Sequence, residues 1–182
     1  MSNTLDFCDA GLTEVPDHLS GQQGLTCVDL SCNKLEQIRP GSIAKDALVE
    51  LNISTNKFSG MPSISWLTAL TRLNLSSNSL ASLGSSLAEL TNLEHLELAR
   101  NKLDDASVVG RLTALVLLDL SCNMLREAPL AGQTLKHLVG LDLSSNRISY
   151  LPKSIGNLSR LVSLKVQSLP PLLPYRCAKA WL

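Results

Sequence analysis

The stretch LVGLDLSSN, residues 138–146, decides the fold, because the chain keeps repeating it. Close copies are LVLLDLSCN at 115–123 and LTRLNLSSN at 70–78. Each copy ends in an asparagine, and six such asparagines recur with a strictly alternating longer and shorter spacing. The period of about 22–23 residues is typical of solenoid proteins, in which every repeat forms one rung of a stack. These ladder asparagines are Asn33, Asn56, Asn78, Asn101, Asn123 and Asn146.

Each rung reads L-x-x-L-x-L-x-x-N-x-L, and its central part has the two-residue period of a β-strand. In the last full copy, Leu141 and Leu143 are expected to face the core, while Asp142 and Ser144 face outward. Such strands stack in parallel at about 4.8 Å per rung. The ladder asparagine is expected to be buried at the turn, where its amide both donates to and accepts from neighbouring rungs. Six full rungs, with a decayed rung at each end, make up the stack.

This pattern strongly resembles the leucine-rich repeat family over roughly residues 5–170. The resemblance implies an α/β solenoid, curved like a horseshoe, with a parallel β-sheet on its concave face and short helical or 3-10 turns on its convex face. We expect a leucine-rich repeat domain over 1–169, with about 7–8 repeats of about 22–23 residues each. A proline-rich C-terminal segment over 170–182 is interpreted as an irregular cap.

The half of each rung that returns to the next strand is less regular. The rung SYLPKSIGNLSRL, residues 149–161, contains L-P-x-x-I-x-x-L and resembles the intracellular Ras-group repeats of Shoc-2-like proteins, which are scaffolds without catalysis of their own. The segment EQIRPGSI, residues 36–43, is more similar to repeats of receptor ectodomains. A proline suits the first turn of a helical piece, so four prolines, each six residues after a ladder position, predict such turns. They are Pro16, Pro62, Pro129 and Pro152.

Composition and charge favour one compact soluble domain. The 182 residues include 16 basic and 16 acidic side chains, which gives no general reason to expect nucleic-acid or membrane binding. No apolar run approaches the ~20 residues that cross a bilayer, and the N-terminal residues MSNTLDFCDAG lack the basic and apolar regions of a signal peptide. Five cysteines without clustered spacing make a poor disulfide framework, and only Cys8 and Cys32 are expected to come close. We therefore expect a cytoplasmic monomer, with end-to-end association if the C-terminal cap is poor.

The sequence predicts no catalytic, metal or cofactor site. It contains no G-x-x-x-x-G-K-[ST] phosphate loop, no G-x-S-x-G elbow and no H-E-x-x-H helix. His95 lies between Glu94 and Glu97, which is half of a metal or acid–base site, but no second histidine or cysteine is near it in the ladder. We interpret His95 as an exposed member of a protein-binding row.

The outward-facing strand positions form the candidate binding surface. Over the eight rungs they carry eight acidic and three basic residues, whereas the rest of the chain carries eight and thirteen. This segregation is expected to steer a basic protein partner. The alternative is that LDLS is the commonest way in which the family writes a rung, so that the aspartates are consensus residues. The candidate partner-binding residues are Asp29, Glu50, Asn52, Arg72, Asn74, His95, Glu97, Arg100, Asp119 and Asp142.

Two functions from different classes follow from this surface. The first is a non-catalytic protein–protein interaction module that binds a partner through its concave face as a signalling scaffold or adaptor. The second is a structural or regulatory domain or fragment of a larger leucine-rich repeat protein.

Deleting residues 170–182 tests the interpretation of the C-terminal segment. If Leu172, Leu173 and Trp181 cover the open end of the core, the deletion will lower stability or cause aggregation, because bare apolar surface drives association. The competing interpretation is a P-x-x-P-x-Arg ligand in PLLPYR, residues 171–176, for an SH3-type groove. It predicts an unchanged denaturation midpoint and the loss of one binding partner.

Overall fold

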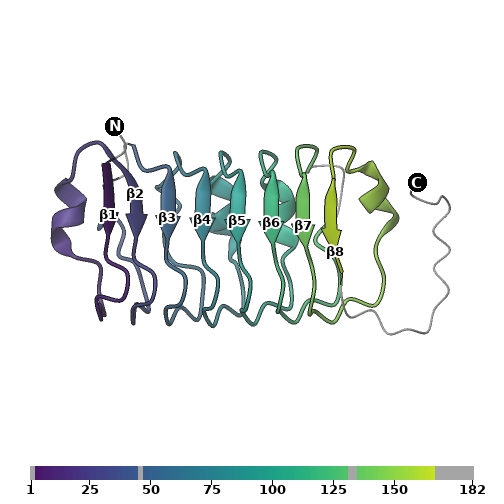
Figure 1. The fold of residues 1–182 in the computed structure, drawn as a ribbon, viewed down its shortest axis with the longest axis horizontal. Coiled ribbons are helices and arrows are strands. Elements are labelled where there is room, and N and C mark those ends of the chain that lie inside the picture. The colour runs from purple at the N-terminus through teal and green to yellow at the C-terminus, as the bar shows by residue number, and fades with distance from the viewer. Residues whose placement is uncertain (1–2, 45–46, 131–134, 167–182) are drawn as a thin grey trace.

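The computed structural model describes residues 3–44, 47–130 and 135–166, which form a stack of rungs along one axis (Figure 1). Each rung contributes one short strand, and in the described ranges the strands form one eight-stranded sheet whose order follows the chain. The strands are β1 (Asn3–Asp6), β2 (Leu25–Asp29), β3 (Glu50–Asn52), β4 (Arg72–Asn74), β5 (His95–Glu97), β6 (Leu117–Asp119), β7 (Gly140–Asp142) and β8 (Ser163–Lys165).

All neighbouring strands are parallel, and their register repeats the period of the sequence. Glu50 pairs with Arg72, and Arg72 pairs with His95, so each pairing joins two residues that are one repeat apart. Equivalent positions of successive rungs therefore lie side by side along the sheet. The predicted parallel sheet is confirmed, and the decayed rungs at the two ends also form strands, β1 and β8.

The core is one column of leucines enclosed between the sheet and the returning segments. Leu141 and Leu143 are 2% and 1% exposed, as their alternation with polar residues predicts. Burial of each such side chain contributes about 1.5–3 kcal/mol. The residue two positions after each ladder asparagine forms a second inner column, and all its members are buried. They are Leu35, Phe58, Leu80, Leu103, Leu125 and Ile148.

The ladder asparagines connect the rungs through their side-chain amides. The Oδ1 atom of Asn101 accepts the backbone N–H of Leu80, in the preceding rung, at 3.0 Å. Its Nδ2 atom donates to the carbonyl oxygen of Leu75, also in the preceding rung, at 3.0 Å, and to that of Leu98 in its own rung at 3.1 Å. All six ladder asparagines make the same set of contacts. Four are buried, whereas Asn56 and Asn78 are half-buried.

The residue before each ladder position has a left-handed backbone. Its φ angle lies between 53° and 57° in seven successive rungs, although no glycine occurs there. This conformation costs L-residues roughly 1–2 kcal/mol, so the surrounding contacts must stabilise it. In the rungs from Asp9 to Cys122, the backbone N–H donates to a carbonyl oxygen of the next rung, as from Thr55 to Ser76 at 2.8 Å. The seven residues are Asp9, Cys32, Thr55, Ser77, Arg100, Cys122 and Ser145.

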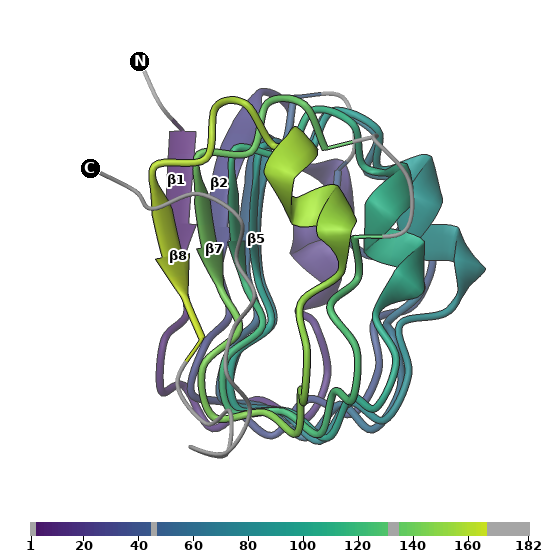
Figure 2. The same ribbon diagram turned by 90° about the vertical axis from the view of Figure 1, so that its right-hand side faces the viewer.

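The face opposite the sheet carries short 3-10 helices (Figure 2). Each has a central apolar residue that packs against the core; Leu19, Leu87 and Val109 are buried in η1, η2 and η3, whereas Ile155 of η4 is half-buried. The 3-10 turns expected on the convex face are confirmed, and the described ranges contain no α-helix. The helices are η1 (Asp17–Gly21), η2 (Ser85–Glu89), η3 (Ser107–Arg111) and η4 (Lys153–Asn157).

Proline marks these turns only in part. Pro16 and Pro152 stand directly before η1 and η4, as predicted. After Pro62 the described chain has bends and turns instead of a helix, and η2 and η3 follow Gly84 and Ala106. The prediction of a helical piece was therefore wrong at Pro62, although the segment after it buries Ile64 and Leu67 and contains a turn in which the Leu67 N–H donates to the Ile64 carbonyl oxygen at 2.9 Å. The segment 170–182 and its boundary at 169 lie outside the described residues.

Replacing Asn101 by alanine tests the structural role of the ladder amide. The change removes the partner of the buried Leu80 N–H and one of the two amide donors to the Leu75 carbonyl oxygen, which keeps its bond from Asn78 Nδ2. We expect a loss of about 1–3 kcal/mol in the free energy of unfolding, which chemical denaturation measures.

The matched control is Asn92→Ala, which removes one exposed amide bond to the carbonyl oxygen of Thr68. Water replaces that bond, so the change should be within about 0.5 kcal/mol. Equal denaturation midpoints for the two variants would contradict the role assigned to Asn101.

Candidate protein-binding face

Two rows of outward side chains run along the sheet. We call them the third and fifth columns, after their positions in the nine-residue repeat, and the strand register aligns each of them across the rungs. The third column is Thr4, Cys27, Glu50, Arg72, His95, Leu117, Gly140 and Ser163. The fifth column is Asp6, Asp29, Asn52, Asn74, Glu97, Asp119, Asp142 and Lys165.

The aspartates and asparagines of the fifth column stabilise the turn that follows each strand. Asp29 Oδ1 accepts the backbone N–H of Ser31 at 2.8 Å, and Asp119 Oδ1 accepts that of Ser121 at 2.8 Å. The same Asx-turn bond occurs in four other rungs, where the accepting Oδ1 atom belongs to Asp6, Asn52, Asn74 or Asp142. Only a short side chain with an acceptor oxygen can reach its own backbone in this way. The acidic character of the column thus has a local structural cause in addition to any role in binding.

Glu97 departs from this pattern. Its side chain is one methylene longer and exposed, and its Oε2 atom accepts the amide of Asn74 from the neighbouring strand at 2.9 Å. A similar contact joins Asn52 Nδ2 to Asp29 Oδ2 at 2.9 Å. The fifth column is therefore a laterally bonded polar row, in which Glu97 is a carboxylate that holds no Asx turn of its own.

Two groups of opposite charge are neighbours in the third column. Arg72 and Glu50 lie 3.7 Å apart, but their side chains are 57% and 43% exposed, so the pair contributes little to stability. Burial, and then the carboxylates of Glu50 and Asp29, raise the pKa of the Cys27 thiol.

A hollow of about 400 Å³ lies farther along the sheet, over β5 to β8. Its centre is apolar, because the Leu117 side chain lies over Gly140: a Cβ at Gly140 would be only 2.7 Å from Leu117 Cδ2. Leu117 is 44% exposed. The rim includes the carboxylates of Glu97, Asp119 and Asp142. The hollow is thus an apolar spot enclosed mainly by negative charge.

Lys165 closes one end of this hollow. Its Nζ atom lies 3.2 Å from Asp142 Oδ2. Partial burial disfavours the charged form of Asp142, but hydrogen bonds from Ser144 and the ammonium of Lys165 outweigh it and lower the pKa of this carboxyl. Asp142 is therefore ionised at neutral pH.

Nine of the ten candidate residues named from the sequence lie on these two columns. The tenth, Arg100, lies beyond the end of β5 in the left-handed turn, with an exposed side chain. Sequence reasoning missed Leu117 and Gly140 as site residues. The signal was present, since a leucine at an outward strand position next to a glycine breaks the polar pattern of the third column.

The described residues contain no cluster of the kind that binds a metal ion. Within 3–44, 47–130 and 135–166, no three histidine, cysteine or acidic side chains lie close enough together to hold a metal ion. Cys8 and Cys32 are both exposed, and a hydrogen bond with Cys8 raises the pKa of the Cys32 thiol, which places these two cysteines beside each other. The helices in these ranges have five residues each, too few to cross a membrane.

Family models match in three places along the solenoid. A model described as "Leucine rich repeat" matches residues 23–80, one described as "Leucine Rich repeats (2 copies)" matches 68–110, and one described as "Leucine Rich Repeat" matches 137–158. A comparison with curated proteins gave no match.

Solved structures with this fold come from several organisms. A leucine-rich repeat protein of Leptospira interrogans is 29% identical with a TM-score of 0.80, over 93% of this chain and 45% of its own. An internalin of Listeria monocytogenes is 25% identical with a TM-score of 0.71, over 87% and 48%. A chain of the Toll–Spätzle complex of Drosophila is 26% identical with a TM-score of 0.75, over 86% and 24%.

This chain spans less than half the length of each of these structures. The likeness nevertheless extends over most of its own length. On these grounds, the chain belongs to the leucine-rich repeat family.

Proposed function

We propose that this chain is a non-catalytic interaction module that binds a protein partner through the concave sheet face, and that it works as a signalling scaffold or adaptor in the cytoplasm. Leucine-rich repeat domains generally mediate protein–protein interactions and are typically non-catalytic. The proposal includes a closer relation to the Ras-group repeats, which rests on L-P-x-x-I-x-x-L in residues 151–158.

The observation that carries the proposal is the hollow around Leu117 and Gly140. Leu117 is exposed beside Gly140, which has no side chain, so an apolar group of a partner can pack against Leu117. Burial of such a group is the main source of binding free energy at a protein interface. Glu97 and Asp119 on the rim then favour a basic side chain next to that apolar group. The expected partner surface therefore presents an aliphatic or aromatic anchor flanked by lysine or arginine.

The alternative function is that of a structural or regulatory part of a larger leucine-rich repeat protein. In support, the solved structures of this fold that match the chain are more than twice as long as the region it covers. The two functions predict different results when the purified chain is used as bait. An interaction module retains a specific protein on its sheet face, whereas a structural part depends on covalent neighbours.

Exchanging the charges of Arg72 and Glu97 tests the proposed face. The double variant Arg72→Glu/Glu97→Arg reverses two exposed side chains on adjacent strands and leaves the net charge unchanged. We expect the partner captured by the tagged wild-type chain from its own cell extract to bind the purified variant at least about tenfold more weakly, a loss of roughly 1.4 kcal/mol.

The matched control is Glu89→Arg/Arg111→Glu, which makes the same exchange at the ends of η2 and η3 on the convex face. This control should bind like the wild type. Retained binding by the concave variant together with lost binding by the convex one would place the partner on the opposite face.

Replacing Leu117 by aspartate tests the apolar centre of the hollow separately from its charge. Because the side chain is 44% exposed, the fold should tolerate the change. We expect weaker partner binding in titration calorimetry and a smaller negative heat-capacity change, since less apolar surface is buried on association. Met124→Asp is the control, because Met124 is similarly exposed, at 36%, but lies beyond the sheet. If both variants bind like the wild type, Leu117 is not an anchor.

A further inference from the structure

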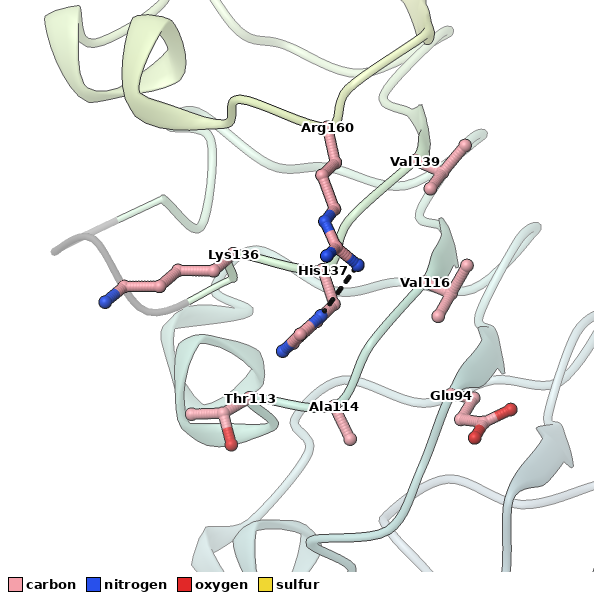
Figure 3. Close-up of a pocket in the computed structure, with 8 residues that line it drawn as sticks. All are labelled: Glu94, Thr113, Ala114, Val116, Lys136, His137, Val139 and Arg160. Carbon is pink, nitrogen blue, oxygen red and sulfur yellow. Dashed lines mark hydrogen bonds between the residues drawn. The ribbon is translucent and has the colours of Figure 1, made fainter.

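A second depression lies outside the concave face, along the edge where the returning segments enter the strands. Its volume is about 750 Å³, and it extends over four successive rungs (Figure 3). Its lining residues are Glu94, Thr113, Ala114, Val116, Lys136, His137, Val139 and Arg160. We call this site the edge groove. None of its residues belongs to the third or fifth column.

The floor of the edge groove is aliphatic. Val116 and Val139 occupy the same position of adjacent rungs, and the backbone N–H of Val139 donates to the carbonyl oxygen of Val116 at 2.8 Å. Val162 continues the row in the next rung, and it is 85% exposed. Three valines therefore form an apolar strip that runs along the stack, across the strands.

One wall of the edge groove is cationic. Arg160 and His137 occupy equivalent positions of adjacent rungs, and the guanidinium Nη1 of Arg160 lies 3.2 Å from His137 Nδ1 (Figure 3). This contact places the guanidinium above the groove. Lys136 precedes His137 and is also exposed.

These cations have no acidic partner in the described part of the chain. The ion pairs found there join Arg39 to Glu14, Arg72 to Glu50 and Lys165 to Asp142. None of them involves Lys136 or Arg160. The unpaired guanidinium of Arg160 and the valine strip constitute a surface that an acidic and aliphatic ligand complements, while the side chain of Lys136 points away from Val116 and Val139 (Figure 3).

Glu94 makes the two ends of the groove different in charge, with a carboxylate at one end and the guanidinium of Arg160 at the other. It lies three rungs from Arg160, so the two charges are separated by roughly 14 Å along the stack at about 4.8 Å per rung. An extended peptide rises about 3.3 Å per residue, so about four residues span that distance. A bound segment would place carboxylates near Arg160, aliphatic side chains over the valines, and a positive charge near Glu94.

We propose that the edge groove is a docking site for a short extended peptide segment of a protein partner, with acidic residues at one end, aliphatic residues in the middle and a basic residue at the other end. The groove favours a peptide over a nucleic acid, because Glu94 in its lining would repel a continuous phosphate backbone.

The site is independent of the concave face, and its test uses synthetic peptides. The probes are two fluorescein-labelled heptapeptides with two glutamates at one end, three aliphatic residues in the middle and a lysine at the other end, one in each direction. We expect one of them to bind the wild-type chain in fluorescence anisotropy. Replacing its glutamates by glutamine should weaken binding at least about tenfold, which corresponds to roughly 1.4 kcal/mol.

The decisive variant is Lys136→Glu/Arg160→Glu, which should also lose at least about tenfold in affinity for that peptide. Its matched control is Arg126→Glu/Arg147→Glu, which changes the net charge equally at two other exposed arginines outside the groove. The control separates local contacts from long-range attraction, so it should bind the peptide like the wild type. The concave variant Arg72→Glu/Glu97→Arg should do the same.

Reversal of charge provides a gain of function. The triple variant Glu94→Lys/Lys136→Glu/Arg160→Glu should prefer a peptide with lysines in place of the glutamates and a glutamate in place of the lysine. Methyl NMR of the wild-type chain should show shifts of Val116 and Val139, which line the groove, and none of the buried Val28.

Three outcomes would overturn the proposal. Equal affinity of the wild type and Lys136→Glu/Arg160→Glu for both peptides would remove the groove as the site. An equal loss in the Arg126→Glu/Arg147→Glu control would reduce the effect to net charge. Tighter binding of a single-stranded oligothymidylate than of either peptide, lost in the same variant, would identify a phosphate ligand instead.

Discussion

The structure depends on one hydrogen-bonding group, the side-chain amide of the ladder asparagine. A single rung has too few backbone partners of its own to satisfy the turn after its strand, and burial of that turn makes unpaired groups costly. The Nδ2 and Oδ1 atoms of Asn101 supply the missing donor and acceptor and connect two rungs at once. Because every full rung repeats this bond, the leucines are held in register and the outward columns are aligned. The candidate surfaces are a consequence of that alignment.

Most of the fold follows from the sequence because its determinants are local and periodic. The alternation around Leu141 fixes which side chains are buried, and the asparagine spacing fixes the strand register. The convex turns were harder to predict, since proline only permits a turn and the burial of a residue such as Leu87 stabilises it. The left-handed backbone at Thr55 could not be foreseen, because it results from contacts between rungs in a residue type that disfavours it.

The candidate sites were only partly predictable, for a related reason. An aspartate such as Asp119 holds the turn after its own strand, so its presence says little about a partner. Positions that depart from the repeat say more about binding. At these positions the residue forms no Asx turn or is apolar where the other rungs have a polar residue. Glu97, Leu117 and Gly140 are such departures on the sheet face. Whether such residues from different rungs form one site depends on how far each side chain extends across the neighbouring rungs. The sequence of a single rung does not reveal that distance.

The alternation between a longer and a shorter repeat has a consequence for how such a protein can change. The nine residues that end in the ladder asparagine have constant length, and the extra residue of the longer repeat falls between that asparagine and the first leucine of the next rung. The strands stay aligned across both spacings. A residue gained or lost on the convex path therefore leaves the sheet surface untouched. In proteins that evolve from this chain, the convex side can change by insertion and deletion, whereas the sheet face changes only by substitution. The two sides of the molecule can therefore evolve at different rates and by different kinds of mutation.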